Sequence, residues 1–141
     1  MKNLFRSFLL MASLTALFTA CENSADPAPQ SQLLSGGSSK TWKVVSIKKD
    51  GSDRFQSSCE ADNLYTFYAD SSFELDEGNK KCRTTDPQKQ LGTWSLTSSA
   101  ITIKQGSRSF MQMEIKSVTS SRLVVTNEVG GEKVETTFQA Q

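Results

Sequence analysis

The residues of this sequence that could do chemistry are three cysteines and scattered carboxylates, and the chain has no histidine. The lack of histidine excludes Ser-His-Asp and Cys-His sites, imidazole acid-base catalysis and His-ligated zinc. The acid pair Asp76 and Glu77 is a poor acid-base pair, because neighbours on a strand point to opposite faces. No nucleophile motif or phosphate-binding loop occurs in the sequence. We therefore expect a non-catalytic protein with no metal and no cofactor.

Cys21 ends an N-terminal segment with the pattern of a secretory signal. Lys2 and Arg6 are the only charges in residues 1–20, and the apolar stretch 8–18 is shorter than the ~20 residues that span a bilayer. The segment closes with Leu17-Phe18-Thr19-Ala20-Cys21, which resembles the lipobox of bacterial lipoproteins, where a small residue precedes an obligatory cysteine.

The lipobox resemblance implies that residues 1–20 are a lipoprotein signal peptide and that Cys21 is lipidated and becomes the mature N-terminus. Phe18 departs from the pattern, since Leu is preferred there. The alternative is an ordinary signal cleaved after Ala20, with Cys21 left as a free thiol. With two or more acyl chains, attachment is stable. We therefore expect a membrane-anchored lipoprotein of a bacterial cell envelope, on the periplasmic side or the cell surface.

The charge balance limits the choice of partners. Lys and Arg total 16 against 15 Asp and Glu, without the basic excess of a nucleic-acid-binding protein. Loss of residues 1–20 would remove Lys2 and Arg6 and no acid, changing the formal net charge from +1 to −1. Membrane contact would therefore depend on the lipid and not on attraction to anionic headgroups.

Residues 21–39 are expected to form the lipidated N-terminus and a flexible tether. The segment is rich in Ser, Gly and Pro and shows no apolar periodicity, a composition typical of linkers. Leu33 and Leu34 allow two interpretations. They belong either to a short helical turn docked on the domain or to a solvated tether.

The domain, residues 40–141, follows a β-strand pattern. From Thr41 onward apolar residues recur at every second position, and no window has helical periodicity. The expected strands cover residues 41–48, 64–68, 72–76, 90–96, 100–105, 109–117, 121–127 and 132–138.

Five hairpins have consistent registers, because opposite residues of an antiparallel pair share a face. Their turns centre on residues such as Asp70, Thr119 and Gly130-Gly131, the last a favoured type I′ sequence. The expected opposite pairs are Tyr65/Leu75, Phe67/Phe73, Trp94/Ile103, Leu96/Ile101, Ile101/Met113, Ile103/Met111, Met113/Val125, Ile115/Leu123, Leu123/Phe138 and Val125/Thr136.

These hairpins predict an all-β, up-and-down antiparallel meander of about eight strands. One face is apolar, and the other is polar from Thr66 to Thr137. Such a meander closes into a barrel or folds over as a sandwich. Closure removes both exposed edges, so we favour the barrel, in which Trp42 and Phe138 point inward near one mouth.

Cys59 and Cys82 flank the hairpin centred on Asp70, and its register brings them side by side with a stagger of one residue. An oxidising, secreted context permits a disulfide between them. The competing interpretation is a metal or redox pair. That pair lacks a CxxC spacing and further ligands, so we expect a structural disulfide.

Short motifs follow one another along the domain: residues 36–44, which read GGSSKTWKV, then Cys59-Glu60-Ala61-Asp62-Asn63, Tyr65-Thr66-Phe67, Asp70-Ser71-Ser72-Phe73, Cys82, Gly92-Thr93-Trp94 and Leu123-Val124-Val125-Thr126. In their order and spacing they resemble the bacterial lipocalin-like lipoprotein family over about Leu33 to Phe138. Asp70-Ser71 departs from the frequent Asp-Gly of that family. The resemblance implies a small β-barrel on a lipid anchor, with no catalytic residues to carry over.

Binding of a small hydrophobic molecule inside the barrel is the first functional hypothesis. An eight-stranded barrel either packs solid or holds one small ligand. In the solid case the same side chains simply fill the core. The candidate lining residues are Tyr65, Phe67, Phe73, Met111, Met113 and Ile115.

The alternative hypothesis is an envelope protein-interaction or inhibitor module that acts through its loops. Segments 50–63 and 77–90 carry many charges, and a Cys59–Cys82 bond would tie them together at one end of the barrel. In both cases we expect a monomer.

Overall fold

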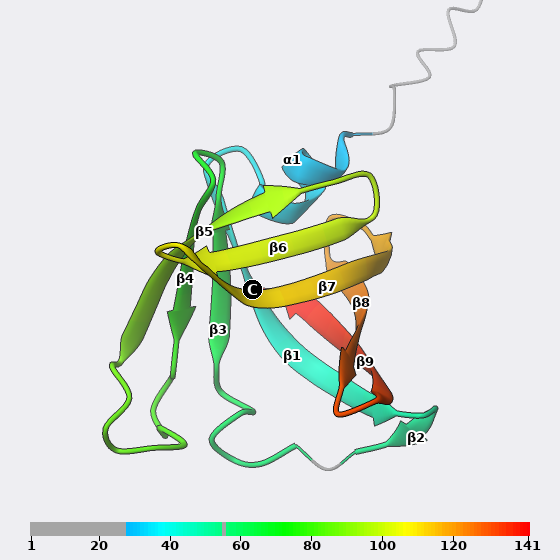
Figure 1. Ribbon diagram of the computed structural model, residues 1–141. Helices are drawn as coiled ribbons and strands as arrows, with labels where there is room; N and C mark the ends of the chain where they lie inside the picture. The colour runs from blue at the N-terminus through cyan, green and yellow to red at the C-terminus, as the bar shows by residue number, and fades with distance from the viewer. Residues whose placement is uncertain (1–27, 55) are drawn as a thin grey trace, which may run out of the picture.

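The computed structural model describes residues 28–54 and 56–141, in which the strands form one antiparallel sheet that curls round to meet itself (Figure 1). The elements are α1 (Gln30–Ser35), β1 (Ser39–Lys49), β2 (Ser52–Asp53), β3 (Leu64–Tyr68), β4 (Ser72–Asp76), β5 (Lys89–Leu96), β6 (Ala100–Gln105), β7 (Arg108–Val118), β8 (Arg122–Val129) and β9 (Glu132–Ala140).

Pairing of the first long strand with the last closes the barrel. Each strand from β4 to β9 pairs with the one before it, and β1 pairs with both β3 and β9. Trp42 lies opposite Ala140 and Val44 opposite Phe138, so Trp42 and Phe138 are one inward pair apart. The predicted eight-stranded, up-and-down barrel is therefore confirmed, and β2 is an additional short strand on the end of β1.

Four of the five predicted hairpin registers are confirmed. Tyr65 lies opposite Leu75, Trp94 opposite Ile103, Ile101 opposite Met113 and Leu123 opposite Phe138. Gly130 and Gly131 both have positive φ angles, 62° and 83°, as a type I′ turn requires.

The predicted register between β7 and β8 is wrong. Ile115, not Met113, lies opposite Val125, and one extra residue forms a bulge before Val118 meets Leu123. The turn is displaced because Thr119 closes it: its amide donates to the Arg122 carbonyl (2.8 Å), and its Oγ1 accepts from the Arg122 amide (3.0 Å). This side-chain cap moves the turn centre beyond Thr119.

The short strand β2 was not predicted. It follows Asp50-Gly51, whose φ angles of 48° and 83° make another tight turn. The Asp50 amide donates to the Lys133 carbonyl at 2.9 Å, which ties this turn to β9. Because β2 has only two residues, no periodicity could reveal it, although an Asp-Gly dipeptide is a recognised hairpin signal.

Helix α1 covers one end of the barrel, and of the two interpretations of Leu33 and Leu34 the structure has the docked turn (Figure 1). Leu34 is fully buried in the core, and its carbonyl accepts from the Trp42 indole Nε1 at 2.8 Å. Lys40 Nζ donates to the Leu33 carbonyl at 2.7 Å. Residues 30–35 are therefore part of the packed domain.

The outward positions predicted from Thr66 to Thr137 are polar, although not all of them are exposed, and the surface also carries the exposed apolar side chains Val45, Leu91, Phe110 and Val129. Thr137 is only 6% exposed. It lies in the closing region of the barrel, opposite Val124 on β8 and Ser46 on β1, so strands cover it on both sides.

Helix α1 has only six residues. In the described part of the chain, no helix has the length and apolar character needed to cross a membrane. The predicted signal peptide and Cys21 lie outside the described residues.

Candidate functional site

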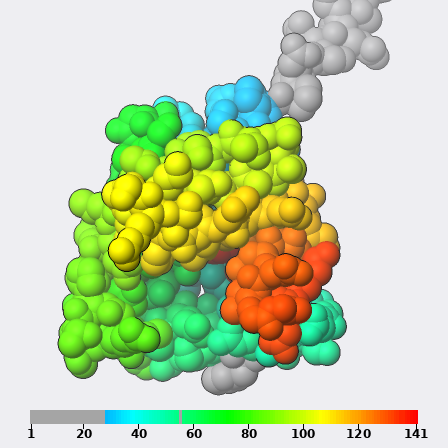
Figure 2. Space-filling view, in the orientation of Figure 1, coloured from blue at the N-terminus to red at the C-terminus, as the bar shows by residue number. Residues whose placement is uncertain are grey.

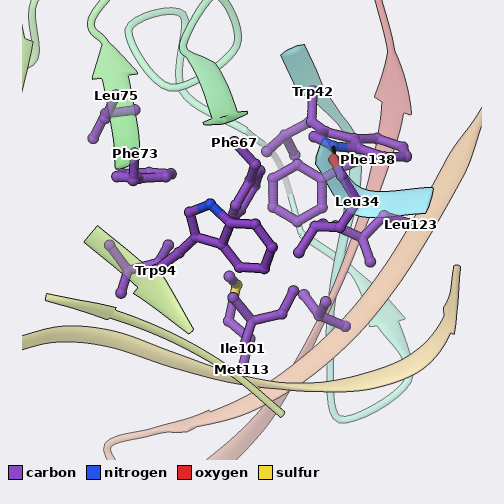
Figure 3. Close-up of a cluster of buried hydrophobic side chains, with 13 residues drawn as sticks. Leu34, Trp42, Phe67, Phe73, Leu75, Trp94, Ile101, Met113, Leu123 and Phe138 are labelled. Carbon is purple, nitrogen blue, oxygen red and sulfur yellow. Dashed lines mark hydrogen bonds between the residues drawn. The ribbon is translucent and has the colours of Figure 1, made fainter. Parts of the chain in front are cut away.

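The end of the barrel nearest α1 is filled with side chains (Figure 3). Phe67 packs edge to face against Trp94 and Phe73, with ring centroids 5.7 and 5.2 Å apart. The Trp94 indole Nε1 donates to the Tyr68 carbonyl at 2.9 Å, so its polar atom is paired. The buried cluster consists of Leu34, Trp42, Val44, Phe67, Phe73, Leu75, Trp94, Ile101, Ile103, Met113, Leu123, Val125 and Phe138.

The six predicted lining residues divide into two groups. Phe67, Phe73 and Met113 are 1%, 2% and 4% exposed and belong to the filled core. Tyr65, Met111 and Ile115 pack against that core but remain only partly buried. Tyr65 and Met111 lie toward the end remote from α1, whereas Ile115 follows Met113 toward the β7–β8 turn, which lies beside α1. Solvent thus reaches the inward-facing Tyr65 and Met111 at the remote end.

The wall of the barrel is incomplete between β7 and β8. Their pairing ends at Glu114 and Thr126, although β7 continues back to Arg108 and β8 continues on to Val129. Figure 2 shows the surface hollowed below β7, beside the β8–β9 hairpin. A depression of about 490 Å³ lies here, lined by Gln112, Glu114, Thr126, Asn127, Glu128 and Lys133.

Phe110 forms a bulge in the part of β7 that does not pair with β8. The register with β6 shifts between Met111 and Ser109, which leaves Phe110 as the extra residue, 41% exposed. A bulge on an unpaired edge disrupts its regular hydrogen-bonding pattern and so discourages pairing with another chain.

A row of polar side chains crosses the inward face at the end remote from α1. Gln90 pairs with Leu75, and Gln105 follows the inward Ile103 by two residues, so both amides face the interior. Gln105 Nε2 donates to Gln90 Oε1 (3.1 Å), and Gln90 Nε2 donates to Glu77 Oε1 (3.0 Å). Glu77 is 5% exposed, although its side chain carries a carboxylate.

Tyr65 joins this polar row to the apolar core. Its ring meets Phe138 edge to face at 5.3 Å, on the core side. Burial raises the pKa of the Tyr65 phenol, and the Glu60 and Glu77 carboxylates add to that shift. The open end of the barrel thus combines partly buried apolar side chains with the Glu60 and Glu77 carboxylates near the Tyr65 phenol.

Two loops pack together across this end of the barrel. Cys59 and Cys82 form a disulfide, with their Cα atoms 5.1 Å apart, as the hairpin register predicts. With its side-chain nitrogen turned toward the neighbouring carbonyls, Asn63 donates to Cys59 (2.9 Å) and to Glu77 (3.1 Å). These bonds hold the Glu77 backbone at the mouth of the barrel.

Asp62 makes the second contact between the loops. Its Oδ2 accepts from the amides of Asn79 (2.7 Å) and Lys80 (3.1 Å). Gly78 has a φ of 67°, and a Cβ there would lie 2.6 Å from the Asp62 carbonyl oxygen, so only glycine fits.

Metal chemistry needs a cluster of ligands. Among the described residues, no group of three or more Cys, Asp or Glu side chains gathers closely enough to hold a metal ion.

Comparison with known families identifies this barrel. The family model of the lipocalin-like domain matches residues 39–125, from the first residue of β1 into β8. The chain belongs to the lipocalin-like domain family. The resemblance inferred from the motifs is thereby confirmed at the level of the domain. A comparison with curated proteins found no match.

The lipocalin-like match covers every residue of the polar row and most of the apolar core. Proteins of this family are generally binding proteins and not catalysts, and their barrel is compatible with a small hydrophobic ligand.

Sequence reasoning missed Glu77, Gln90 and Gln105. The signal was available, because the inward positions of β4 and β6 continue in steps of two from Leu75 to Glu77 and from Ile103 to Gln105. The predicted inward face contains only apolar residues, so it omits Gln90 and Gln105, although both lie within predicted strands, and Glu77 falls in the predicted loop 77–90.

Proposed function

We propose that this lipocalin-like domain binds a small hydrophobic molecule at the end of its barrel remote from α1, and that a lipid on Cys21 anchors it to a bacterial cell envelope. The observation that carries the binding proposal is the division of the inward face. Tyr65 and Met111 point into the barrel at this end and contact the core, yet they are not sealed from solvent.

An apolar ligand would complete the packing that these side chains lack. Burying apolar surface gives about 25 cal/mol per Å², so even a short alkyl chain gains several kcal/mol before the cost of immobilising it. Methionine is unbranched and adapts to differently shaped partners. Met111 is therefore suited to a permissive apolar surface.

Calorimetric titration with 1-octanol tests this function, using residues 21–141 with Cys21→Ser to remove the proposed lipid site. We expect saturable binding with one site per chain. Met111→Trp should fill the space and weaken binding at least tenfold, whereas Phe110→Trp, on the exposed bulge, should leave it unchanged. Absence of saturable binding would refute the proposal and leave the disulfide-tied loops as the surface for a protein partner.

The lipid anchor is tested separately. The proposal rests on the lipobox-like sequence that ends at Cys21. Cells expressing the full chain should incorporate labelled palmitate into the protein, and Cys21→Ser should abolish the label and release the protein from membranes. Continued labelling of the variant would refute the assignment of Cys21.

A further inference from the structure

The Glu77 side chain is an unusual group to find inside a barrel. It is 5% exposed, and no ion pair in the described part of the chain involves it. A buried carboxylate without a positive partner is costly, since the desolvation penalty of an ion amounts to several kcal/mol. By contrast, Glu74 on the outward face of β4, the strand that ends just before Glu77, pairs with Lys89 at 2.8 Å.

The two glutamines beside Glu77 are oriented toward negative charge. Gln105 donates to the oxygen of Gln90, and Gln90 donates through its nitrogen to Glu77 Oε1. The two amides thus form a hydrogen-bonded chain whose last N–H donates to the Glu77 carboxylate. Of the described residues, Gln90 alone donates to the Glu77 side chain, so Oε2 is left to accept from another partner.

The polar row also borders the proposed apolar surface. Leu75 lies directly between Tyr65 on β3 and Gln90 on β5, and Met111 pairs with Ile103, two residues from Gln105. Along β4 and β6, the next inward position after the apolar residues carries a carboxylate or an amide. The inward face therefore changes from apolar to polar over two residues. A molecule that lies across this boundary needs an apolar body and one polar end.

We propose that Glu77 selects small amphiphiles with a protonated amine, whose ammonium group pairs with the free carboxylate oxygen while the alkyl part covers Met111 and Tyr65. This inference rests on the proposed binding function and specifies the class of its ligand. An ammonium group supplies the missing charge and donates charge-assisted hydrogen bonds. A carboxylate or phosphate head would meet like charge.

The test compares three probes of equal chain length, octylamine, 1-octanol and octanoate, by calorimetry at pH 7. Residues 21–141 with Cys21→Ser should bind octylamine at least tenfold more tightly than 1-octanol, and octanoate more weakly than both. Glu77→Gln keeps the size of the side chain and should remove the preference for the amine. The matched control Glu74→Gln, on the outward face, should retain it.

The results distinguish amine selection by Glu77 from the binding of apolar molecules on which it rests. If 1-octanol binds but octylamine binds no more tightly, or if the preference survives in Glu77→Gln, selection by Glu77 is refuted while apolar binding stands. If none of the three probes binds, both proposals fail. The comparison within the unmodified barrel is decisive even if Glu77→Gln does not fold.

Discussion

At the residue scale, the interior of this barrel changes character along its axis. Trp42 and its neighbours near α1 are buried and have their polar atoms paired, whereas Glu77 at the other end is buried with a single side-chain hydrogen bond. Well-packed side chains stabilise the domain, and incompletely paired polar groups are more often kept for function. This contrast locates the proposed site within one small interior.

Truncating Trp42 should destabilise the domain strongly. The side chain is fully buried and its indole donates to the Leu34 carbonyl, so Trp42→Ala removes core packing and the link to α1 together. Large-to-small changes of this kind cost about 3–5 kcal/mol, a large part of a typical stability of ~5–15 kcal/mol. Urea unfolding measures the loss, and Val45→Ala, at a half-exposed position, is the control that should change stability little. A loss for Trp42→Ala below 1 kcal/mol would contradict the packing described.

Tyr65 should make stability depend on pH in the alkaline range. Because the folded state raises the pKa of its phenol, mainly by burial, the folded state favours the protonated form. This contribution is fully present below the unfolded pKa of about 10 and is lost as the pH rises through the higher folded pKa. The free energy of unfolding should therefore fall less steeply above pH 10 in Tyr65→Phe than in the wild type. Equal slopes for the two proteins would contradict the assignment.

At the scale of elements, the two loops at the open end behave as one unit. The Cys59–Cys82 bond, the Asp62 contacts with the 79–80 backbone and the Asn63 amide all join residues 56–63 to the segment after β4. Binding residues are often carried on loops held by a rigid scaffold. Here the loops position Glu77 at the edge of the barrel interior.

Loss of the disulfide should lower stability and loosen this end of the molecule. Cross-linking residues 23 apart stabilises by about 3 kcal/mol in the chain-entropy account. We expect Cys59→Ser/Cys82→Ser to lose a comparable amount in urea unfolding and to bind octylamine more weakly. Reduction of the wild type should reproduce the effect and leave the double variant unchanged. A wild type that unfolds identically with and without reductant would refute this role.

Most elements of the fold could be predicted from sequence because the strands alternate strictly and the turns contain residues such as Gly130-Gly131. The β7–β8 register could not, since the Thr119 side chain caps the turn and a bulge absorbs the extra residue. Docking of α1 depends on the tertiary contact between Leu34 and Trp42. The polar row was missed because Gln90 and Gln105 look like ordinary solvent-facing residues in a sequence.

At the scale of the whole molecule, the proposed function depends on two features: the sheet closes into a barrel, and side chains do not completely fill its interior. Pairing of β1 with β9 removes the outer edges of the sheet, while the β7–β8 wall remains open beyond Glu114 and Thr126. A barrel of eight strands has room for a core or for one small ligand. In this domain the buried core lies beneath α1, and Tyr65 and Met111 remain partly exposed toward the other end.

The two methionines of the domain provide the most direct test of this division. The chain has four methionines, of which only Met111 and Met113 lie beyond the predicted signal peptide, and both point inward on β7. Met111 is partly buried toward the open end, whereas Met113 is sealed in the core. In ¹³C-methyl-methionine NMR, titration with octylamine should shift the Met111 signal saturably and move the Met113 signal far less. Two unperturbed methyl signals at saturating octylamine would contradict a ligand site inside the barrel.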